Sequence, residues 1–257
     1  MASNRDPLDA PQRSALTFTV TRKELQSGPA VAGRRLLRRC GPAALATSLR
    51  GAPYASLVLY AVDHDDSPLL LLSDLAQHSR NIAFEPRVSL LIDGTAGLPE
   101  PLSGPRLTLL GWAEETADRR LMGRFIARYP DSKVYAGFAD FKLYRVAVER
   151  GQLIAGFGQI AWIDGPDLLF SQDSTAIAAA EPAILARVNE DLSETLAGCV
   201  ARRLGRPGDG WRATGCDPEG LDIRSGDAAA RLEFAAPVAT ADAVPAALAE
   251  LVATAGE

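Results

Sequence analysis

The segment spanning residues 69–92 constrains the fold of this chain most, because its character changes three times within a short stretch. An apolar strand at 69–73 runs into the polar sequence Leu75-Ala76-Gln77-His78-Ser79-Arg80-Asn81, a short helix follows, and a second apolar strand begins at Arg87. A strand that opens into a helix gathers free backbone N–H groups, here with a hydroxyl, an imidazole and a guanidinium. This junction predicts an anion site suited to a phosphorylated cofactor.

Short apolar strands separated by turns continue on both sides of the junction. Strands are predicted at 43–49, 54–62, 69–73, 87–93, 106–115, 142–148 and 152–163, and helices at 30–39, 80–84 and 117–129. An antiparallel meander with helices in its gaps predicts a small closed β-barrel with appended helices. We therefore expect an α+β chain with a flexible arm at 1–16, a split-barrel domain at 17–165 and a smaller α+β domain at 166–257.

In the smaller domain, the sequence predicts a helical region at 176–201, strands within 211–224 and 229–234, and a terminal helix at 241–254. Turns are expected at Asp217-Pro218-Glu219-Gly220 and at Ser225-Gly226-Asp227. This alternation is typical of a compact α+β module.

Charge and composition exclude several classes of function. A formal net charge of −5 argues against nucleic-acid binding, which needs a basic field. Two histidines in the whole chain exclude a multi-histidine metal centre. Cys40, Cys199 and Cys216 form no C-x-x-C pair, which favours a reducing compartment. Because residues 1–20 lack the apolar core of a signal peptide and the apolar runs are strand-sized, we expect a cytoplasmic protein without a membrane partner.

Several segments resemble the FMN-binding split-barrel family typified by pyridoxamine 5′-phosphate oxidase, and in particular its haem-utilisation branch. That branch shows S-x-L-A-x-H-[ST]-[RK]-N followed by x-P-[RK]-x-S-L-L, which residues 73–81 and 85–91 fit. The smaller domain resembles the domain of unknown function that follows the barrel in this branch. Relatives carry two histidines in a helix of that domain, where this chain has Arg187 and Leu192.

The resemblance implies an FMN site built from three groups of residues. Ser73, His78, Ser79, Arg80 and Asn81 would hold the phosphate, with His78 as the leading contact. Ala55, Ser56, Leu57 and Val58 would line the flavin from one strand, and Arg106 would lie near the ring. Gly156, Phe157 and Gly158 would let the backbone approach the ligand. For each group a plain structural role stays open: a surface histidine, an ordinary barrel strand, a solvated arginine and a bulge.

Three hypotheses for function follow. The first is an FMN-binding oxidoreductase acting on an unknown small molecule, in which the flavin supplies the chemistry and the catalytic residues are unknown. The second is a haem-binding or haem-degrading protein, weakened because no histidine follows His78. The third is a non-catalytic protein that binds a cofactor or a partner. The deazaflavin F420 could replace FMN, and the family implies a homodimer with the cofactor between its subunits.

Overall fold

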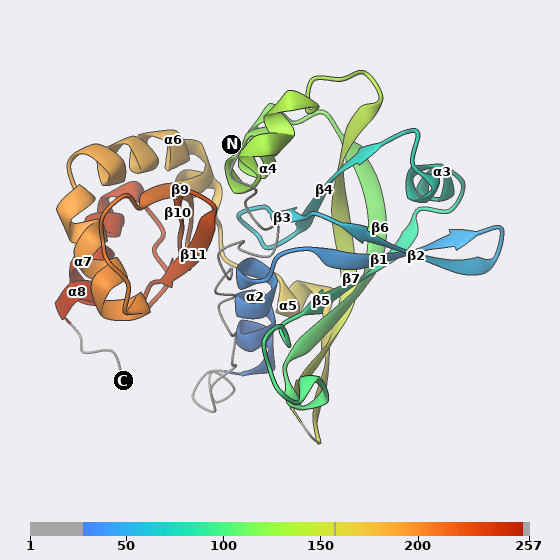
Figure 1. Cartoon of the computed structure of the whole chain (residues 1–257), viewed down its shortest axis with the longest axis horizontal. Helices are drawn as coiled ribbons and strands as arrows, with labels where there is room; N and C mark the ends of the chain where they lie inside the picture. The colour runs from blue at the N-terminus through green and yellow to red at the C-terminus, as the bar shows by residue number, and fades with distance from the viewer. Residues whose placement is uncertain (1–27, 157, 254–257) are drawn as a thin grey trace, which may run out of the picture.

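The computed structural model describes residues 28–156 and 158–253, in which a large antiparallel sheet and a smaller α+β module flank one central helix (Figure 1). The large sheet has eight strands: β1 (Ala43–Leu49), β2 (Ala52–Val58), β3 (Ala61–Val62), β4 (Pro68–Ser73), β5 (Arg87–Asp93), β6 (Arg106–Thr116), β7 (Phe141–Gly156) and β8 (Gln159–Asp164). Its helices are α2 (Pro29–Arg39), α3 (Gln77–Phe84), α4 (Arg119–Arg128) and α5 (Gly165–Leu168). Short 3-10 turns are η1 (Pro101–Ser103) and η2 (Pro130–Val134).

The sheet divides at the long strand β7. Its strand order is β2-β1-β5-β6-β7-β4-β3, and β8 pairs with β7 beside this path. The first half of β7 pairs with β4 and the second half with β8, while β6 pairs along both halves. The mixed α+β class and the split sheet are confirmed. The closed barrel is wrong in detail, because β2 and β3 are terminal strands of the described path and do not pair with each other.

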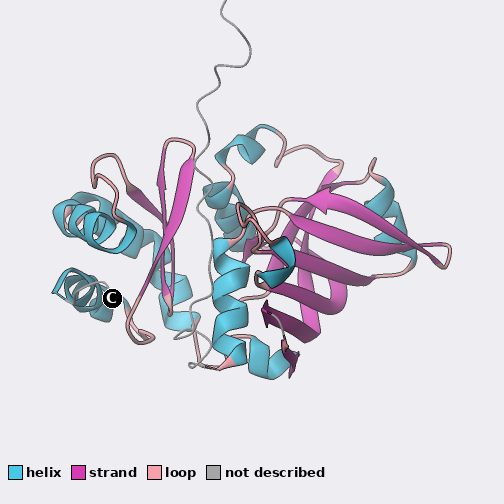
Figure 2. Ribbon diagram, turned by 60° about the horizontal axis from the view of Figure 1, so that its bottom comes forward, coloured by secondary structure: helices cyan, strands magenta, loops and turns pink. Residues whose placement is uncertain are grey.

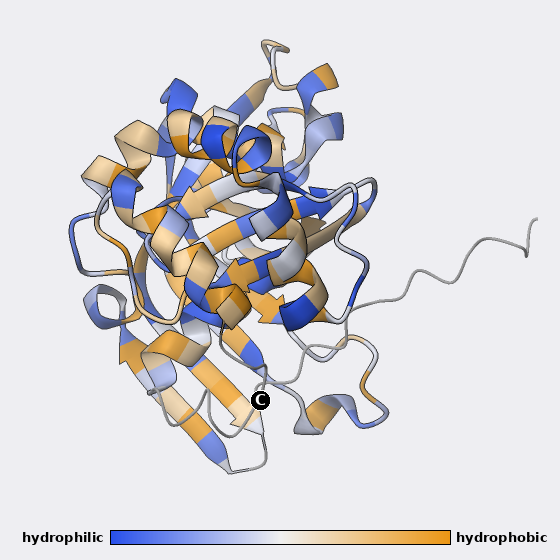
Figure 3. Cartoon of the chain, turned by 90° about the vertical axis from the view of Figure 1, so that its left-hand side faces the viewer, coloured by the Kyte–Doolittle hydropathy of each residue, from blue (hydrophilic) through white to orange (hydrophobic). Residues whose placement is uncertain are grey.

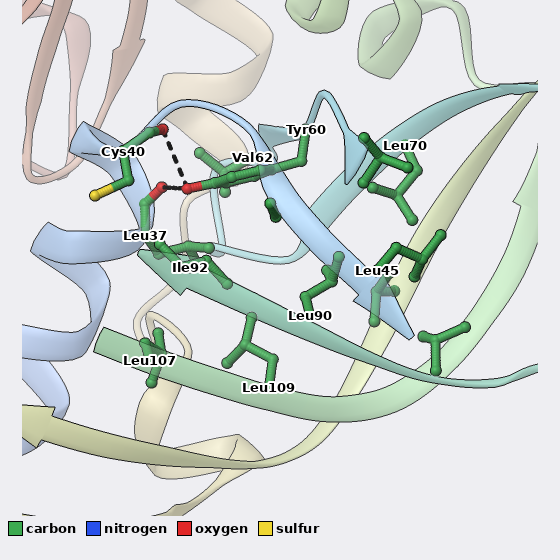
Figure 4. Close-up of a cluster of buried hydrophobic side chains, with 14 of the residues drawn as sticks. Leu37, Cys40, Leu45, Tyr60, Val62, Leu70, Leu90, Ile92, Leu107 and Leu109 are labelled. Atoms are coloured by element: carbon green, nitrogen blue, oxygen red, sulfur yellow. Dashed lines mark hydrogen bonds between the residues drawn. The ribbon is translucent and has the colours of Figure 1, made fainter. Parts of the chain in front are cut away.

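Alternation along the strands separates a buried inner face from an exposed outer face. In β1 and β5 every second residue is buried, whereas β4 is apolar and buried from Pro68 to Leu72. Leucines from β1, β5 and β6 fill the inner face, and α2 covers it (Figure 4). The Tyr60 hydroxyl donates to the Leu37 carbonyl at 2.7 Å and the Cys40 carbonyl at 3.1 Å, which fixes the end of α2 to the core.

The smaller module has a separate core. Its elements are α6 (Thr175–Glu190), α7 (Ser193–Leu204), β9 (Arg212–Asp217), β10 (Gly220–Ser225), β11 (Ala228–Glu233), η3 (Ala241–Ala243) and α8 (Val244–Ala253). The strands form an antiparallel sheet in the order β11-β10-β9, with the long helices stacked on one face (Figure 2). These helices alternate hydrophobic and hydrophilic residues, as coloring by hydropathy shows (Figure 3). The predicted division between residues 165 and 166 stays a prediction, and the predicted arm at 1–16 lies outside the described residues.

Buried ion pairs join the two parts of the chain across α2 and α4. The Arg38 Nη1 atom lies 2.7 Å from Asp217 Oδ2, and both side chains are almost fully buried. Arg34 binds both carboxylate oxygens of Glu219, at 2.9 and 2.8 Å. Arg124 of α4 pairs with Glu181 of α6. Because desolvated charges need fixed partners, these pairs define how the smaller module sits on the sheet.

Three details of the sequence analysis change. The predicted strands 142–148 and 152–163 are instead one long strand β7, which ends at Gly156, and a separate strand β8, which begins at Gln159. Strand 54–62 is interrupted before β3, and α3 begins three residues earlier than predicted, at Gln77. All three cysteines are free and buried, and burial raises the pKa of Cys40 to about 12. Across residues 28–156 and 158–253 no helix is both long and apolar enough to cross a membrane.

Candidate functional site

Helix α3 caps the open end of the sheet that β1 and β2 form. It begins after Ala76 without a side-chain cap, so its first N–H groups have no capping side chain. Asn81 holds the helix in place: its Nδ2 donates to Thr47 Oγ1 of β1 at 2.9 Å, and its Oδ1 accepts from Gln77 at 2.8 Å. Asn81, proposed from the sequence as a phosphate donor, thus has its amide engaged in a structural role.

His78 and Ser56, predicted as site residues from distant segments, are in contact. The His78 Nδ1 atom lies 3.1 Å from the Ser56 hydroxyl, on the inner side of β2. The imidazole is partly buried, and this burial lowers its pKa. A neutral ring at neutral pH follows, with Nε2 lacking a hydrogen-bond partner among the residues described.

The remaining residues that were predicted to hold the phosphate have different roles in the structure. Ser73 donates to Asp140 at 2.8 Å, which ties β4 to the start of β7. Ser79 is 3% exposed, and its hydroxyl has no hydrogen-bond partner within the described chain. Arg80 is exposed. The structure therefore gathers these residues around α3, but only Ser79 and Arg80 keep donor groups free.

The predicted flavin strand contributes to both faces of the sheet. Val58 points into the core, whereas Ala55 and Leu57 are exposed, Leu57 by 75%. Register pairing continues the row of Leu57 across six strands. The row comprises Leu57 of β2, Ala44 of β1, Leu91 of β5, Thr108 of β6, Gln152 of β7 and Trp162 of β8.

We call the exposed side of these strands the outer face; besides that row it carries Leu110, Trp112, Ile154 and Ile160. Trp162 is 52% exposed and Ile160 61%. Arginines stack on its indole rings: the Arg150 guanidinium lies 4.6 Å from the Trp162 ring centroid and Arg87 5.9 Å from that of Trp112. The outer face is thus rich in apolar side chains, is interrupted by Thr108 and Gln152, and is bordered by cations.

Arg106 and the glycine turn lie away from α3 in the same chain. Arg106 pairs in register with Asp93, at the far end of β5 from α3, a separation of roughly 20 Å for a strand of this length. Its guanidinium donates to the Leu102 and Gly104 carbonyls at 3.1 and 3.3 Å. Gly156 and Gly158 have φ of 148° and 75°, which the hairpin requires, and Phe157 lies outside the described residues.

A buried polar cluster that the sequence analysis missed surrounds His64, which is 2% exposed. Its Nδ1 lies 2.8 Å from Arg120, and its Nε2 lies 3.2 Å from both Arg124 and Glu181. Burial opposes ionisation of Asp63, but hydrogen bonds from His64 and Arg120 outweigh it and hold the Asp63 pKa well below its usual range. From the sequence alone, the Asp-rich stretch 63–66 is interpreted as a solvent-exposed turn. No local pattern indicates that Glu181 contacts His64.

A sheet that divides at one long strand, with a helix over its end, defines a split β-barrel protein. Residues 32–155, just under half of the chain, match the family described as Pyridoxamine 5'-phosphate oxidase. This confirms the family resemblance and the fold predicted from the sequence.

Similar proteins extend the comparison to the smaller module. A protein of unknown function from Agrobacterium tumefaciens is 29% identical, with a TM-score of 0.72 over 92% of this chain and 100% of its own. A heme binding protein from Mycobacterium smegmatis is 28% identical, with a TM-score of 0.53 over 86% of this chain and 94% of its own. The chloroplastic heme oxygenase HOZ of Arabidopsis thaliana is 33% identical over 109 residues, 41% of this chain. This chain spans about a third of the length of HOZ, 33%.

Proposed function

We propose that the chain is a haem-binding protein that holds the macrocycle against the outer face of its sheet, beneath a second copy of the same chain. The observation that carries this proposal is the set of exposed and partly exposed leucine, isoleucine and tryptophan side chains on the outer face, in and beside the row that crosses six strands from Leu57 to Trp162. A flat apolar ring suits such a surface, and the bordering Arg106 and Arg150 supply cations for two propionates, whereas Arg87 is already paired with Glu85.

His78 is the residue suited to hold the iron. Neutral imidazole is the usual protein ligand of haem iron, and burial lowers the His78 pKa toward the neutral form. His78 contacts Ser56 from the inner side of β2; because β2 is the terminal strand of the sheet, a haem on the outer face would have to extend past the free edge of β2 to meet the imidazole. The other histidine, His64, has both ring nitrogens engaged by ionic side chains. Haem bound here would supply an iron centre for redox or oxygen chemistry.

The similarity to the mycobacterial heme binding protein and to HOZ supports haem as the bound molecule. We limit the proposal to binding, because Arg187 and Leu192 replace the branch's histidines and neither is an ordinary iron ligand.

Titration of haem into the purified protein, followed by absorbance, tests the proposal. We expect a saturable Soret band whose position reports an imidazole ligand, loss of that signature in His78→Ala, and its recovery on adding free imidazole. Arg119→Ala, an exposed change on α4, serves as the control. A Soret spectrum identical in wild type and His78→Ala would exclude His78 as ligand, and absence of any saturable band would overturn haem binding.

FMN is the second candidate, and with it an oxidoreductase activity. The free donors of Ser79 and Arg80 at the start of α3 favour it, because a phosphate needs such groups. F420 would present a phosphate to the same donors. Flavin absorbance retained through purification, with no Soret band on adding haem, would put this candidate first.

A further inference from the structure

Ser56 places a hydroxyl on the inner side of β2, next to the hydrophobic core. Its register partner on β1 is Leu45, which is completely buried, and the next inward residue along β2 is the buried Val58. A hydroxyl that is partly buried at such a position loses hydration and needs a hydrogen-bond partner from the protein. The imidazole of His78 supplies that partner, with Nδ1 at 3.1 Å from the Ser56 Oγ atom.

Two side chains of α3 hold this helix against the β1–β2 hairpin. His78 and Asn81 are three residues apart and therefore lie on one side of the helix. Asn81 donates to Thr47 of β1, and His78 contacts Ser56 of β2. Thr47 pairs with Tyr54, two residues from Ser56, so both anchors lie close together on the hairpin. The imidazole is thus fixed with Nδ1 toward β2 and Nε2 on the other side of the ring.

The direction of the Ser56–His78 hydrogen bond decides what Nε2 can do. A serine hydroxyl can either donate or accept. If it donates to Nδ1, the neutral ring carries its proton on Nε2 and offers a donor there. If it accepts from Nδ1–H, Nε2 keeps its lone pair and can bind a metal. His78 lies in the first turn of α3, where the helix dipole disfavours an imidazolium, so the neutral ring takes one of these two forms.

We propose that Ser56 is the positioning residue of His78, accepting from its Nδ1–H and so keeping the Nε2 lone pair available to iron. This inference rests on the haem proposal above. A histidine that binds a metal almost always donates its other ring N–H to a neighbour, which fixes the tautomer and the orientation of the ring. Ser56 lies where that neighbour must be. FMN would require the opposite tautomer, with Nε2–H donating to the phosphate.

Nitrogen-15 chemical shifts of the imidazole measure the tautomer directly, without a bound cofactor. The chain has two histidines, so His78→Ala assigns the signals. At about pH 8, where the ring is neutral, we expect the Nδ1–H form in wild type and in Ser56→Thr, and a mixture of both forms in Ser56→Ala. The Nε2–H form in wild type would overturn the proposal, because Ser56 would then be the donor. A tautomer that does not change in Ser56→Ala would overturn it as well.

Haem titration of the same variants tests the effect on the iron ligand. Ser56→Ala should weaken haem binding about tenfold, whereas Ser56→Thr, which keeps a hydroxyl and suits a strand, should bind as wild type does. Ser171→Ala removes an exposed hydroxyl before α6 and is the control. Equal affinity of wild type and Ser56→Ala would overturn the positioning role. A wild-type protein that binds no haem would remove the haem proposal, and the tautomer would still test Ser56 on its own.

Discussion

Buried charged residues lie where the two parts of the chain meet. Asp217 is completely buried, and Arg231 and Arg38 overcome the cost of burial and hold its pKa well below the usual range. Asp66 is also completely buried, but desolvation, with Glu219 and Asp217 nearby, outweighs the attraction of Arg38 and raises its pKa to about 7. The pKa values of these two neighbouring carboxylates are thus shifted in opposite directions.

Asp66 gives the free energy of unfolding a pH dependence between pH 5 and 8. Its pKa is higher in the folded chain than the ordinary 3.8, so the folded state holds the proton more tightly. The stabilisation is complete at low pH and is lost as pH rises through about 7. Burial is outweighed and the pKa is lowered at three other carboxylates, Asp63, Glu181 and Asp217. These groups change the free energy of unfolding only below about pH 5. We expect the free energy of unfolding to fall toward pH 8, and Asp66→Asn to remove this fall.

Urea denaturation at several pH values measures the effect, taken as the difference between wild type and Asp66→Asn. His78, whose pKa is lowered, acts in the opposite direction in both proteins and cancels from that difference. Asp65→Asn, the neighbouring carboxylate, is the control. A difference that stays constant from pH 5 to 8 would show that Asp66 is ionised throughout.

Elements with a local apolar pattern, alternating or continuous, could be located from the sequence, and elements shaped by distant contacts could not. Strands β1, β4 and β5 lie where their apolar pattern predicts them. In the sequence, strand β7 looks broken at Gly151, yet the strand continues through it. The glycine is explained by packing, since a Cβ at this position would approach Leu168 Cδ2 to 2.7 Å. The glycine admits a side chain from α5 and does not mark a turn.

The candidate site could likewise be predicted only where it depends on local sequence. His78 and Ser56 were both predicted and do meet, since the motif around α3 and the strand that it covers are local features. Arg106 and the turn at Gly156 lie far from them within one chain, and no pattern in one sequence reveals which residues a second copy would contribute. His64 was missed because its partners Arg124 and Glu181 are distant in sequence.

Gly111 allows β6 and β7 to stay paired at their bulge. Pairing shifts register between Leu110 and Gly111, and a Cβ at Gly111 would lie 2.2 Å from the Ala147 carbonyl oxygen. Gly111→Ala must push the strands apart, and we expect a loss of about 3 kcal/mol in the free energy of unfolding. Gly123 lies at an exposed position of helix α4 with open space around it, so Gly123→Ala should raise the free energy of unfolding by about 0.5–1 kcal/mol. Denaturant unfolding of both variants checks this pair, and similar effects would contradict the steric account.

At the scale of the whole molecule, the outer face is the surface that most needs a partner. Soluble monomers rarely expose a continuous apolar patch across a whole sheet. The outer face carries many apolar side chains in and beside the row from Leu57 to Trp162, which only Thr108 and Gln152 interrupt, and the opposite side of the same strands is already filled by the core. A two-fold pair would bury both copies of this face.

We therefore predict a stable homodimer through the outer face. Leu57→Asp and Trp162→Asp each place a charge on an exposed residue of that face, so neither should disturb the core, yet in a dimer each would bury an unpaired carboxylate. Sedimentation velocity at micromolar concentration should show a dimer for wild type and a monomer for both variants. Val134→Asp, at a residue that is 75% exposed in the separate turn η2, should remain dimeric. A wild-type monomer would refute the prediction, and a dimer in all three variants would move the interface to another surface.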